Sequence, residues 1–358
     1  MTESTGISIN FCGSQTVFRG TIATISADSL ASRQIGGFRQ SFSSGKVCRH
    51  CLADCRNLSQ YFSEADCVIR TTETHSGHLN AICIDQSCCR TYGVKSTCVF
   101  DQLCGFSVFS SMPSDVMHDI LEGFCVLNMQ LVLQTLIRTK KLTLSAFNDR
   151  LDMFVFAKCD IACKPPHLPD DFVGRGRLLG SASQNWCLFC NLPFLVSDCI
   201  DYESNNEPYC PNFWQLHLLA REICKIVFAP AVRQEWLLDL QQLIIEHHTL
   251  LAAADGDFFT PKVHFLIHYP RLIEIYGPLR YVWCMQYEAS HQYYKKVSRI
   301  SNNYKNIALT LAERHQFKAC WSMSGANALK NDISISARQS TLHSVHCCNT
   351  ETAAATAA

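Results

Sequence analysis

The chain has 358 residues, of which 47% are hydrophobic and 17% are charged. This composition is typical of a folded protein with one large core or two smaller ones, and it excludes an intrinsically disordered chain. Lysine plus arginine equals aspartate plus glutamate at 31 each, so the molecule as a whole has no net charge that would attract nucleic acid. Any contact with DNA must therefore come from a local patch.

The 22 cysteines are scattered along the chain, and its first residues (MTESTGISINFCG) lack the basic and apolar regions of a signal peptide. We therefore expect a reducing compartment, in which the thiols are buried small side chains or metal ligands. The most apolar stretch, CVLNMQLVLQTLI, is shorter than the roughly 20 residues that cross a bilayer, so no membrane span is expected.

The first half of the chain changes character twice. Residues 17–27 (VFRGTIATISA) are rich in β-branched side chains and end at Asp28, which predicts a core strand with a carboxylate at its end. Residues 33–110 hold glycine pairs, cysteines and histidines with weak periodicity, which favours an irregular module and predicts no helix. From Ser114 a helix-start signal and apolar residues at helical spacing predict a helix to about Arg138.

The second half is predicted to be helical. Residues 144–276 contain four or five helix-like stretches, notably 211–227 and 231–253, so we predict an all-helical insertion. After a break at Gly277-Pro278, residues 281–299 resume a helical pattern that contains Glu288. Beyond about Lys330 the chain is rich in Ser, Thr and Ala, which predicts a disordered tail.

Acidic residues at two places suggest chemistry on phosphodiesters. Asp115, His118, Asp119 and Glu122 fall at i, i+3, i+4 and i+7, so they share one helical face that either binds a hard metal or is simply solvated. Cleavage of DNA uses two divalent cations held by carboxylates from different elements. Asp28 and Glu288 are the carboxylates that we nominate; the alternative for each is a surface or cap residue.

A zinc site is predicted in the cysteine-rich module. Cys48-Arg-His-Cys51 and His75-Ser-Gly-His78 together supply two thiols and two imidazoles for one tetrahedral zinc. Nearby alternatives for a ligand are the following residues: His50, Cys55, Cys67, Cys83, Cys88 and Cys89. His264 and His268, at i and i+4, mark either a second metal site or core histidines; their apolar neighbours favour the core.

The segment from His291 to Lys318 is basic, with one acidic residue, Glu313, and interleaved tyrosines. Its cations are Lys295, Lys296, Arg299, Lys305, Arg314 and Lys318. This segment is the best candidate surface for DNA phosphate, the alternative being an ordinary basic helix face. No glycine-rich phosphate loop, nucleophile elbow or kinase motif occurs in the sequence.

Several segments together resemble the CACTA-like (En/Spm) DNA transposases, in particular the animal members of the CACTA, Mirage and Chapaev group. The resemblance spans roughly residues 20 to 321, and these segments carry it: MPSDVMHDILEG (112–123), PKVHFLIHYP (261–270), GPL (277–279) followed by WCMQYE (283–288), and LAERHQ (311–316). It implies an α/β fold, a partial RNase H-like core interrupted by the helical insertion. By motif, SADSLASRQIGGF (26–38) followed by CRHC makes Asp28 the second residue of an Asp, Asp, Glu triad, Glu288 its last residue, and Asp115 with His118 the DxxH signature.

The resemblance also implies how the chain is organised and what it binds. Residues 1–32 would be strands of the RNase H-like core, 33–110 a zinc-binding Cys/His-rich module, 111–140 the DxxH helix, 141–276 the insertion, 277–325 the last core helices and 326–358 the disordered tail. The implied cofactors are Mg²⁺ or Mn²⁺ at the carboxylates; Zn²⁺ in the module is expected from the spacing of its cysteines and histidines. The implied partners are the DNA ends of the transposon and further copies of the chain, with no membrane, and the implied location is the nucleus, or the cytoplasm for a non-functional remnant.

Two departures from the family pattern bear on activity. The first aspartate of the triad belongs on an early strand before Asp28, but residues 1–27 contain no aspartate. Ser290 occupies a stretch where relatives carry a basic residue. The chain is therefore expected to be an N-terminally truncated transposase derivative, ancestrally a metal-dependent nuclease and strand transferase and now inactive. The alternative is a non-catalytic, domesticated or relic zinc protein that binds DNA or protein; an unrelated zinc hydrolase fits less well, because no three-ligand open site can be assembled.

Overall fold

The computed structural model describes residues 6–11, 13–174, 177–200, 210–254 and 258–324, and these are mostly helical with one small sheet. The helices in chain order are α1 (Ser29–Ile35), α2 (Thr72–Ile84), α3 (Cys88–Tyr92), the π-helix η3 (Met117–Phe124), α4 (Cys125–Arg138), α5 (Leu144–Met153), α6 (Ala182–Val196), α7 (Cys210–Val227), α8 (Glu235–Ala254), α9 (Pro261–Phe265), α10 (Tyr269–Tyr276), α11 (Met285–Ser301) and α12 (Ile307–Ser324). Short 3₁₀ turns are η1 (Leu58–Gln60), η2 (Glu64–Asp66), η4 (Ile161–Cys163), η5 (Ser197–Cys199), η7 (Leu266–His268) and η8 (Leu279–Tyr281).

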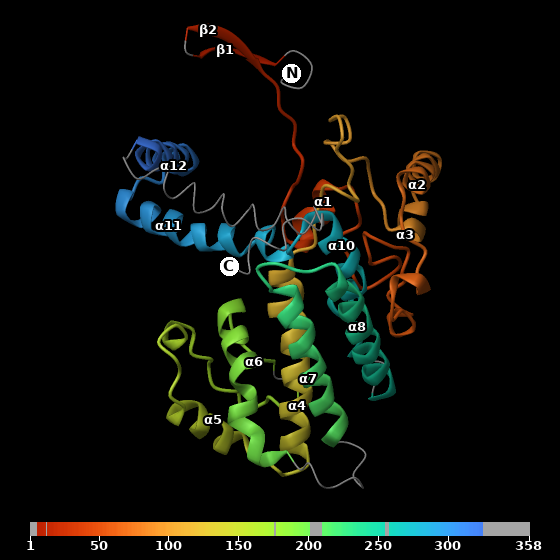
Figure 1. The fold of residues 1–358 in the computed structure, drawn as a ribbon, viewed down its shortest axis with the longest axis vertical. Coiled ribbons are helices and arrows are strands. Elements are labelled where there is room, and N and C mark those ends of the chain that lie inside the picture. The colour runs from red at the N-terminus through yellow and green to blue at the C-terminus, as the bar shows by residue number, and fades with distance from the viewer. Residues whose placement is uncertain (1–5, 12, 175–176, 201–209, 255–257, 325–358) are drawn as a thin grey trace, which may run out of the picture.

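The sheet is an antiparallel hairpin of β1 (Ile7–Phe11) and β2 (Ser14–Phe18), with Ile7 opposite Phe18. It stands away from the helices at the end of an extended segment (Figure 1). All residues of β2 are exposed, and residues 19–28 form no strand. The prediction of a core strand over residues 17–27 is therefore wrong. The β-branched side chains of this segment had suggested burial, but in the described part of the chain only β1 pairs with β2, and no other strand covers them.

The body is built on the helix predicted from Ser114 to about Arg138, which is confirmed as η3 continued by α4. α4 packs against α6 and α7, and α7 packs against α8 (Figure 1). The inward face of α4 is apolar, with Met129, Leu133 and Leu136 almost inaccessible to solvent. The run Met117–Arg138 is long and apolar enough to cross a membrane by length and composition, whereas the sequence analysis had considered only the shorter stretch CVLNMQLVLQTLI. Of its most apolar segment, 56% is buried within the protein.

The helices predicted at 211–227 and 231–253 are confirmed as α7 and α8, and the one predicted at 281–299 is confirmed as α11. α11 and α12 together form an arm that extends from the body (Figure 1). No residue of α12 is buried. The predicted disordered tail, 326–358, lies outside the described residues.

Residues 33–110 contain two helices that the sequence did not predict, α2 and α3. A third, α1, begins at Ser29 and ends inside this segment. α2 was missed because only His75 and Ile82 along it are buried, so it has almost no apolar periodicity. Its start is set instead by a capping box in which Thr71 and Thr74 bond to each other's backbone amides. A small second core lies under this module, formed by Phe38, Ile82, Val94, Cys98, Phe106, Val108 and Met112.

Candidate metal centre and carboxylate site

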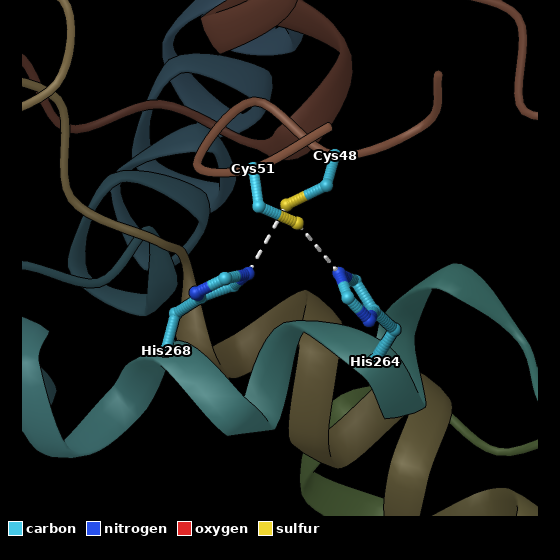
Figure 2. A group of neighbouring side chains, drawn as sticks. All are labelled: Cys48, Cys51, His264 and His268. Atoms are coloured by element: carbon cyan, nitrogen blue, oxygen red, sulfur yellow. Dashed lines mark hydrogen bonds between the residues drawn. The ribbon is translucent and has the colours of Figure 1, made fainter. Parts of the chain in front are cut away.

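Four buried side chains come together from two distant parts of the chain: Cys48, Cys51, His264 and His268. Their ligand atoms all lie within 4.8 Å of one another. The Sγ of Cys48 lies 3.3 Å from Nε2 of His268, and the Sγ of Cys51 lies 3.3 Å from Nε2 of His264 (Figure 2). Two thiols and two imidazoles at this separation form a donor set that suits a tetrahedral metal such as zinc.

Local structure directs each pair of ligands inward. The Cys48–Cys51 loop is closed by a hydrogen bond from the Val47 amide to the Ala53 carbonyl, and the His50 amide points at the Cys48 sulfur at 3.3 Å. On the other side, α9 begins with a Thr260 cap and Pro261 in its first turn. His264 and His268, four residues apart on the continuous α9–η7 run, therefore face the loop together.

The second nitrogen of one imidazole is held by a carboxylate. Nδ1 of His268 lies 2.5 Å from Oε1 of Glu64, and Arg271 Nε donates to the same carboxylate at 2.9 Å. Burial acts to raise the pKa of Glu64, but the hydrogen bonds from His268 and Arg271 outweigh it and hold that pKa below its ordinary value. A carboxylate behind a metal-binding histidine fixes the ring and its tautomer. Burial lowers the pKa of His264, which favours the neutral ring that binds metal.

The histidines that the sequence had placed beside Cys48 and Cys51 lie elsewhere, so that ligand set is corrected. His75 is buried against the rings of Phe38 and Phe109, at 5.5 and 5.3 Å between centroids. His78 stacks on Tyr92 at 4.2 Å. The sequence favoured them because they are close in the chain. His264 and His268 are indeed buried, yet they face thiols, and the signal for this role was their i, i+4 spacing.

The DxxH residues form a polar site at the start of the DxxH helix. Oδ2 of Asp115 makes a short hydrogen bond with Nδ1 of His118, while Oδ1 accepts from the Cys284 amide at 2.9 Å. Nε2 of His118 lies 3.3 Å from Oε1 of Glu288 on α11 and 3.9 Å from Oε2 of Glu122. The hydrogen bond with Asp115 is the largest cause that raises the pKa of His118. Burial acts to raise the pKa of Asp115, but its bonds to His118 and the Cys284 amide hold it below the ordinary value.

Two of the three predicted carboxylates, Asp115 and Glu288, meet at His118, and Asp115 also accepts from the amide of Cys284, whose thiol is buried. Burial raises the pKa of that thiol to about 12, and the charges of Asp115, Asp28 and Glu288 act in the same direction. Asp28 also caps α1, since one of its oxygens accepts from the Ala31 amide at 2.7 Å. It therefore fits both its predicted role near the site and the alternative role as a cap residue.

Asp119 departs from the shared polar face that was predicted for it. It is only 2% exposed and lies in the core, where the Tyr269 hydroxyl donates to its Oδ2 at 3.3 Å. Burial, then the charge of Asp115, raise its pKa to about 7. The exposed part of the face is thus made by His118 and Glu122, with Glu288 from α11 completing it.

The predicted cationic residues lie on the arm and are exposed: Lys295, Lys296, Arg299, Lys305 and Arg314. Tyr293 and Tyr294 hold the two helices together, because Tyr294 Oη lies 2.9 Å from His315 Nδ1 and Lys318 sits 4.2 Å above the Tyr293 ring. A shallow cleft of about 530 Å³ between the helices is lined by Tyr294, Lys295, Arg299 and Tyr304, among others.

Comparison of the chain with family models, with curated proteins and with solved structures finds no match.

Proposed function

We propose that this chain derives from a cut-and-paste DNA transposase with an RNase H-like core, that it binds DNA and zinc, and that it cleaves DNA weakly or not at all. The observation that supports it best is that Asp115 and Glu288 meet at one imidazole: Asp115 Oδ2 bonds to Nδ1 of His118, and Glu288 Oε1 lies 3.3 Å from Nε2 of the same ring. These two carboxylates were nominated from two motifs far apart in the sequence. On this proposal the partner is the DNA of transposon ends, the chain is nuclear and associates with itself, and Met117–Arg138 is a core helix.

The state of the carboxylates supports loss of cleavage. Divalent cations at such a site polarise the phosphate and activate the attacking group, and two of them require at least three carboxylates. Asp115 accepts from His118, from the Cys284 amide and from the Met117 amide, and its side chain is 1% exposed. That carboxylate orients its neighbours and has no free edge for a cation. Asp28 and Glu288 remain, and on this proposal they hold at most one Mg²⁺ or Mn²⁺, weakly.

A nicking assay on supercoiled plasmid with Mn²⁺ tests the catalytic part. We expect no cleavage above background for the unmodified chain. Metal-dependent nicking that Glu288→Gln abolishes and Glu122→Gln preserves would show that the site is active and would overturn the loss of cleavage. Glu122 is the matched control because it also lies beside His118, at 3.9 Å, but on the DxxH helix itself.

Fluorescence anisotropy with a labelled DNA duplex tests the binding part. Exposed lysines that touch phosphate release counterions, so the affinity should fall steeply with salt, and replacing Lys295 and Lys296 by Glu should weaken binding and flatten that dependence. The matched control is Lys140 and Lys141, an adjacent pair at the far end of α4, replaced in the same way. Equal loss of affinity in both double variants would reject the arm as the DNA surface.

A second candidate is a zinc protein whose partner is another protein. The observation that favours it is the apolar surface of the arm, where Phe317, Trp321 and Met323 on α12 are each at least 70% exposed. Absence of DNA binding by the unmodified, zinc-loaded chain would favour this candidate over the first.

A further inference from the structure

The two residues between the metal-binding cysteines reach the carboxylate site. Arg49 donates from both terminal nitrogens, to the carbonyls of Met112 and Pro113, at 2.5 Å each. His50 Nε2 lies 3.1 Å from the Ser114 hydroxyl. Met112, Pro113 and Ser114 immediately precede Asp115, so the Cys48–Cys51 loop holds the backbone from which the DxxH helix starts. Arg49 and His50 are 6% and 3% exposed, so water does not compete for these bonds.

The residues beside the metal-binding histidines reach the same helix from the other side. Lys262, two residues before His264, donates to the carbonyls of His118 and Glu122 at 2.8 and 3.2 Å. Tyr269, next to His268, donates to Asp119. A side chain at Gly123 would collide with Lys262, with 2.4 Å between the added carbon and Cδ, so the lysine lies directly on the helix.

We propose that the metal centre sets the geometry of the carboxylate site, with Arg49 as its principal positioning residue. A metal bound by Cys48, Cys51, His264 and His268 fixes the loop to the α9–η7 run, and the residues adjoining these ligands then hold the DxxH helix between them. Without the metal, the thiol–imidazole contacts that join the two segments are weak, and the ring of His50, 5.2 Å from that of His268 between centroids, adds a further contact. Loss of the metal therefore releases Asp115 and His118.

Packing alone does not fix this part of the chain. A cavity of about 10 Å³ lies where the loop, the start of α1 and the DxxH helix meet, and its lining is almost entirely polar: Ser29, Arg33, Arg49, His50, Ser114, Asp115 and Asp119, with Phe265. Met112 is packed in the small second core, and the hydrogen bonds that Arg49 and His50 make add directional contacts that position residues 112–115. Ser29 in this lining is the first residue of α1, which Asp28 caps.

Amide hydrogen exchange of residues 112–119 tests the coupling on the full chain, read by mass spectrometry with α5 as the internal reference. We compare the zinc-loaded chain, the chain stripped by a chelator, and zinc-loaded Arg49→Met and Arg49→Lys. The stripped chain and Arg49→Met should exchange at residues 112–119 about tenfold faster, while α5 keeps its protection. The stripped chain loses the ion that fixes the loop, and Arg49→Met loses two charge-assisted bonds. Arg49→Lys should recover part of the protection because one carbonyl stays within reach.

The matched control is Arg221→Met, which removes a guanidinium that also bonds two backbone carbonyls, those of Phe189 and Cys190, away from both sites. It should leave residues 112–119 unchanged. Should Arg49→Met unfold, Tyr269→Phe provides a milder change that removes one hydroxyl contact to Asp119, with a few-fold effect expected. Unchanged protection of residues 112–119 in the stripped chain, or in a folded, zinc-loaded Arg49→Met or Tyr269→Phe, would overturn the proposal.

The inference rests on the proposed function only for the meaning of the carboxylate site, and the two fail separately. Electron paramagnetic resonance measures Mn²⁺ binding by the same samples. No Mn²⁺ binding by the zinc-loaded chain would count against the proposed function, while the exchange data would still decide whether the metal centre holds the DxxH helix.

Discussion

Replacement of Asp119 by Asn should change how the stability of the protein depends on pH. The Asp119 carboxyl is fully buried, and burial is the main cause that raises its pKa from 3.8 to about 7. Below pH about 4 the group is protonated in both the folded and the unfolded chain. Between about 4 and 7 only the unfolded chain releases the proton, so unfolding becomes progressively more favourable, and above about 7 the penalty is constant.

The size of the effect follows from the shift. The pKa of Asp119 rises from 3.8 to about 7, and each pH unit of that rise is worth about 1.4 kcal/mol, so the unfolding free energy falls by about 4 kcal/mol between pH 4 and pH 8. Asparagine keeps the shape and a hydrogen bond acceptor for Tyr269 but has no proton to release. The unfolding free energy of Asp119→Asn relative to the unmodified chain should therefore rise by about that amount across this range.

Urea unfolding of the zinc-loaded proteins at intervals from pH 4 to pH 8, followed by circular dichroism, measures the difference. Asp171→Asn, at an exposed position, controls for removal of a carboxyl group as such. Parallel curves for the unmodified chain and Asp119→Asn would refute the reasoning, because they would mean that the buried carboxyl carries the same charge in both states.

Three further outcomes follow from the structure. His268→Gln should reduce bound zinc, measured by mass spectrometry of metal content, from one ion per chain to nearly none, whereas His78→Gln should leave it unchanged; the reverse pattern would restore the ligand set first predicted from sequence. Asp28→Ala should cost about 1 kcal/mol through loss of the α1 cap and Asp28→Asn much less, while both should weaken Mn²⁺ binding; Mn²⁺ affinity equal to that of the unmodified chain in both variants would remove Asp28 from the site. Leu133→Ala, at a fully buried position on α4, should lower the unfolding free energy by about 2–5 kcal/mol in denaturant titration, and a change below about 1 kcal/mol would mean that α4 is not a core helix.

The spacing of apolar residues along the sequence predicted the amphipathic helices of this fold. The helices of the second half carry apolar residues at helical spacing, so their burial is recorded along the sequence, and their limits agree with α4, α7, α8 and α11 to within a few residues. β-branched composition failed at residues 17–27 because a strand is buried only if other strands cover it. That information does not lie within the segment itself.

The candidate metal centre also depends on information that lies outside the local sequence. Cys48 and Cys51 were recognised from their own spacing, but their partners lie 220 and 213 residues further along the chain. No spacing rule connects residues so far apart, and an analysis that starts from the cysteines selects the nearer pair, His75 and His78. The apolar surroundings of His264 and His268 concealed their role, because a metal ligand in a core and a core histidine have the same neighbours in sequence.

That separation also fixes when the metal can be bound during synthesis. Cys48 and Cys51 leave the ribosome more than two hundred residues before His268. The four-ligand site therefore cannot form until α4 to α8, which lie between the two pairs, have emerged and folded closely enough to bring α9 to the loop. The closing of so long a loop by a metal removes a large part of the freedom of the unfolded chain. If the cluster holds a metal as proposed, acquisition of the ion is thus a late step of folding, possible only after His268 has emerged.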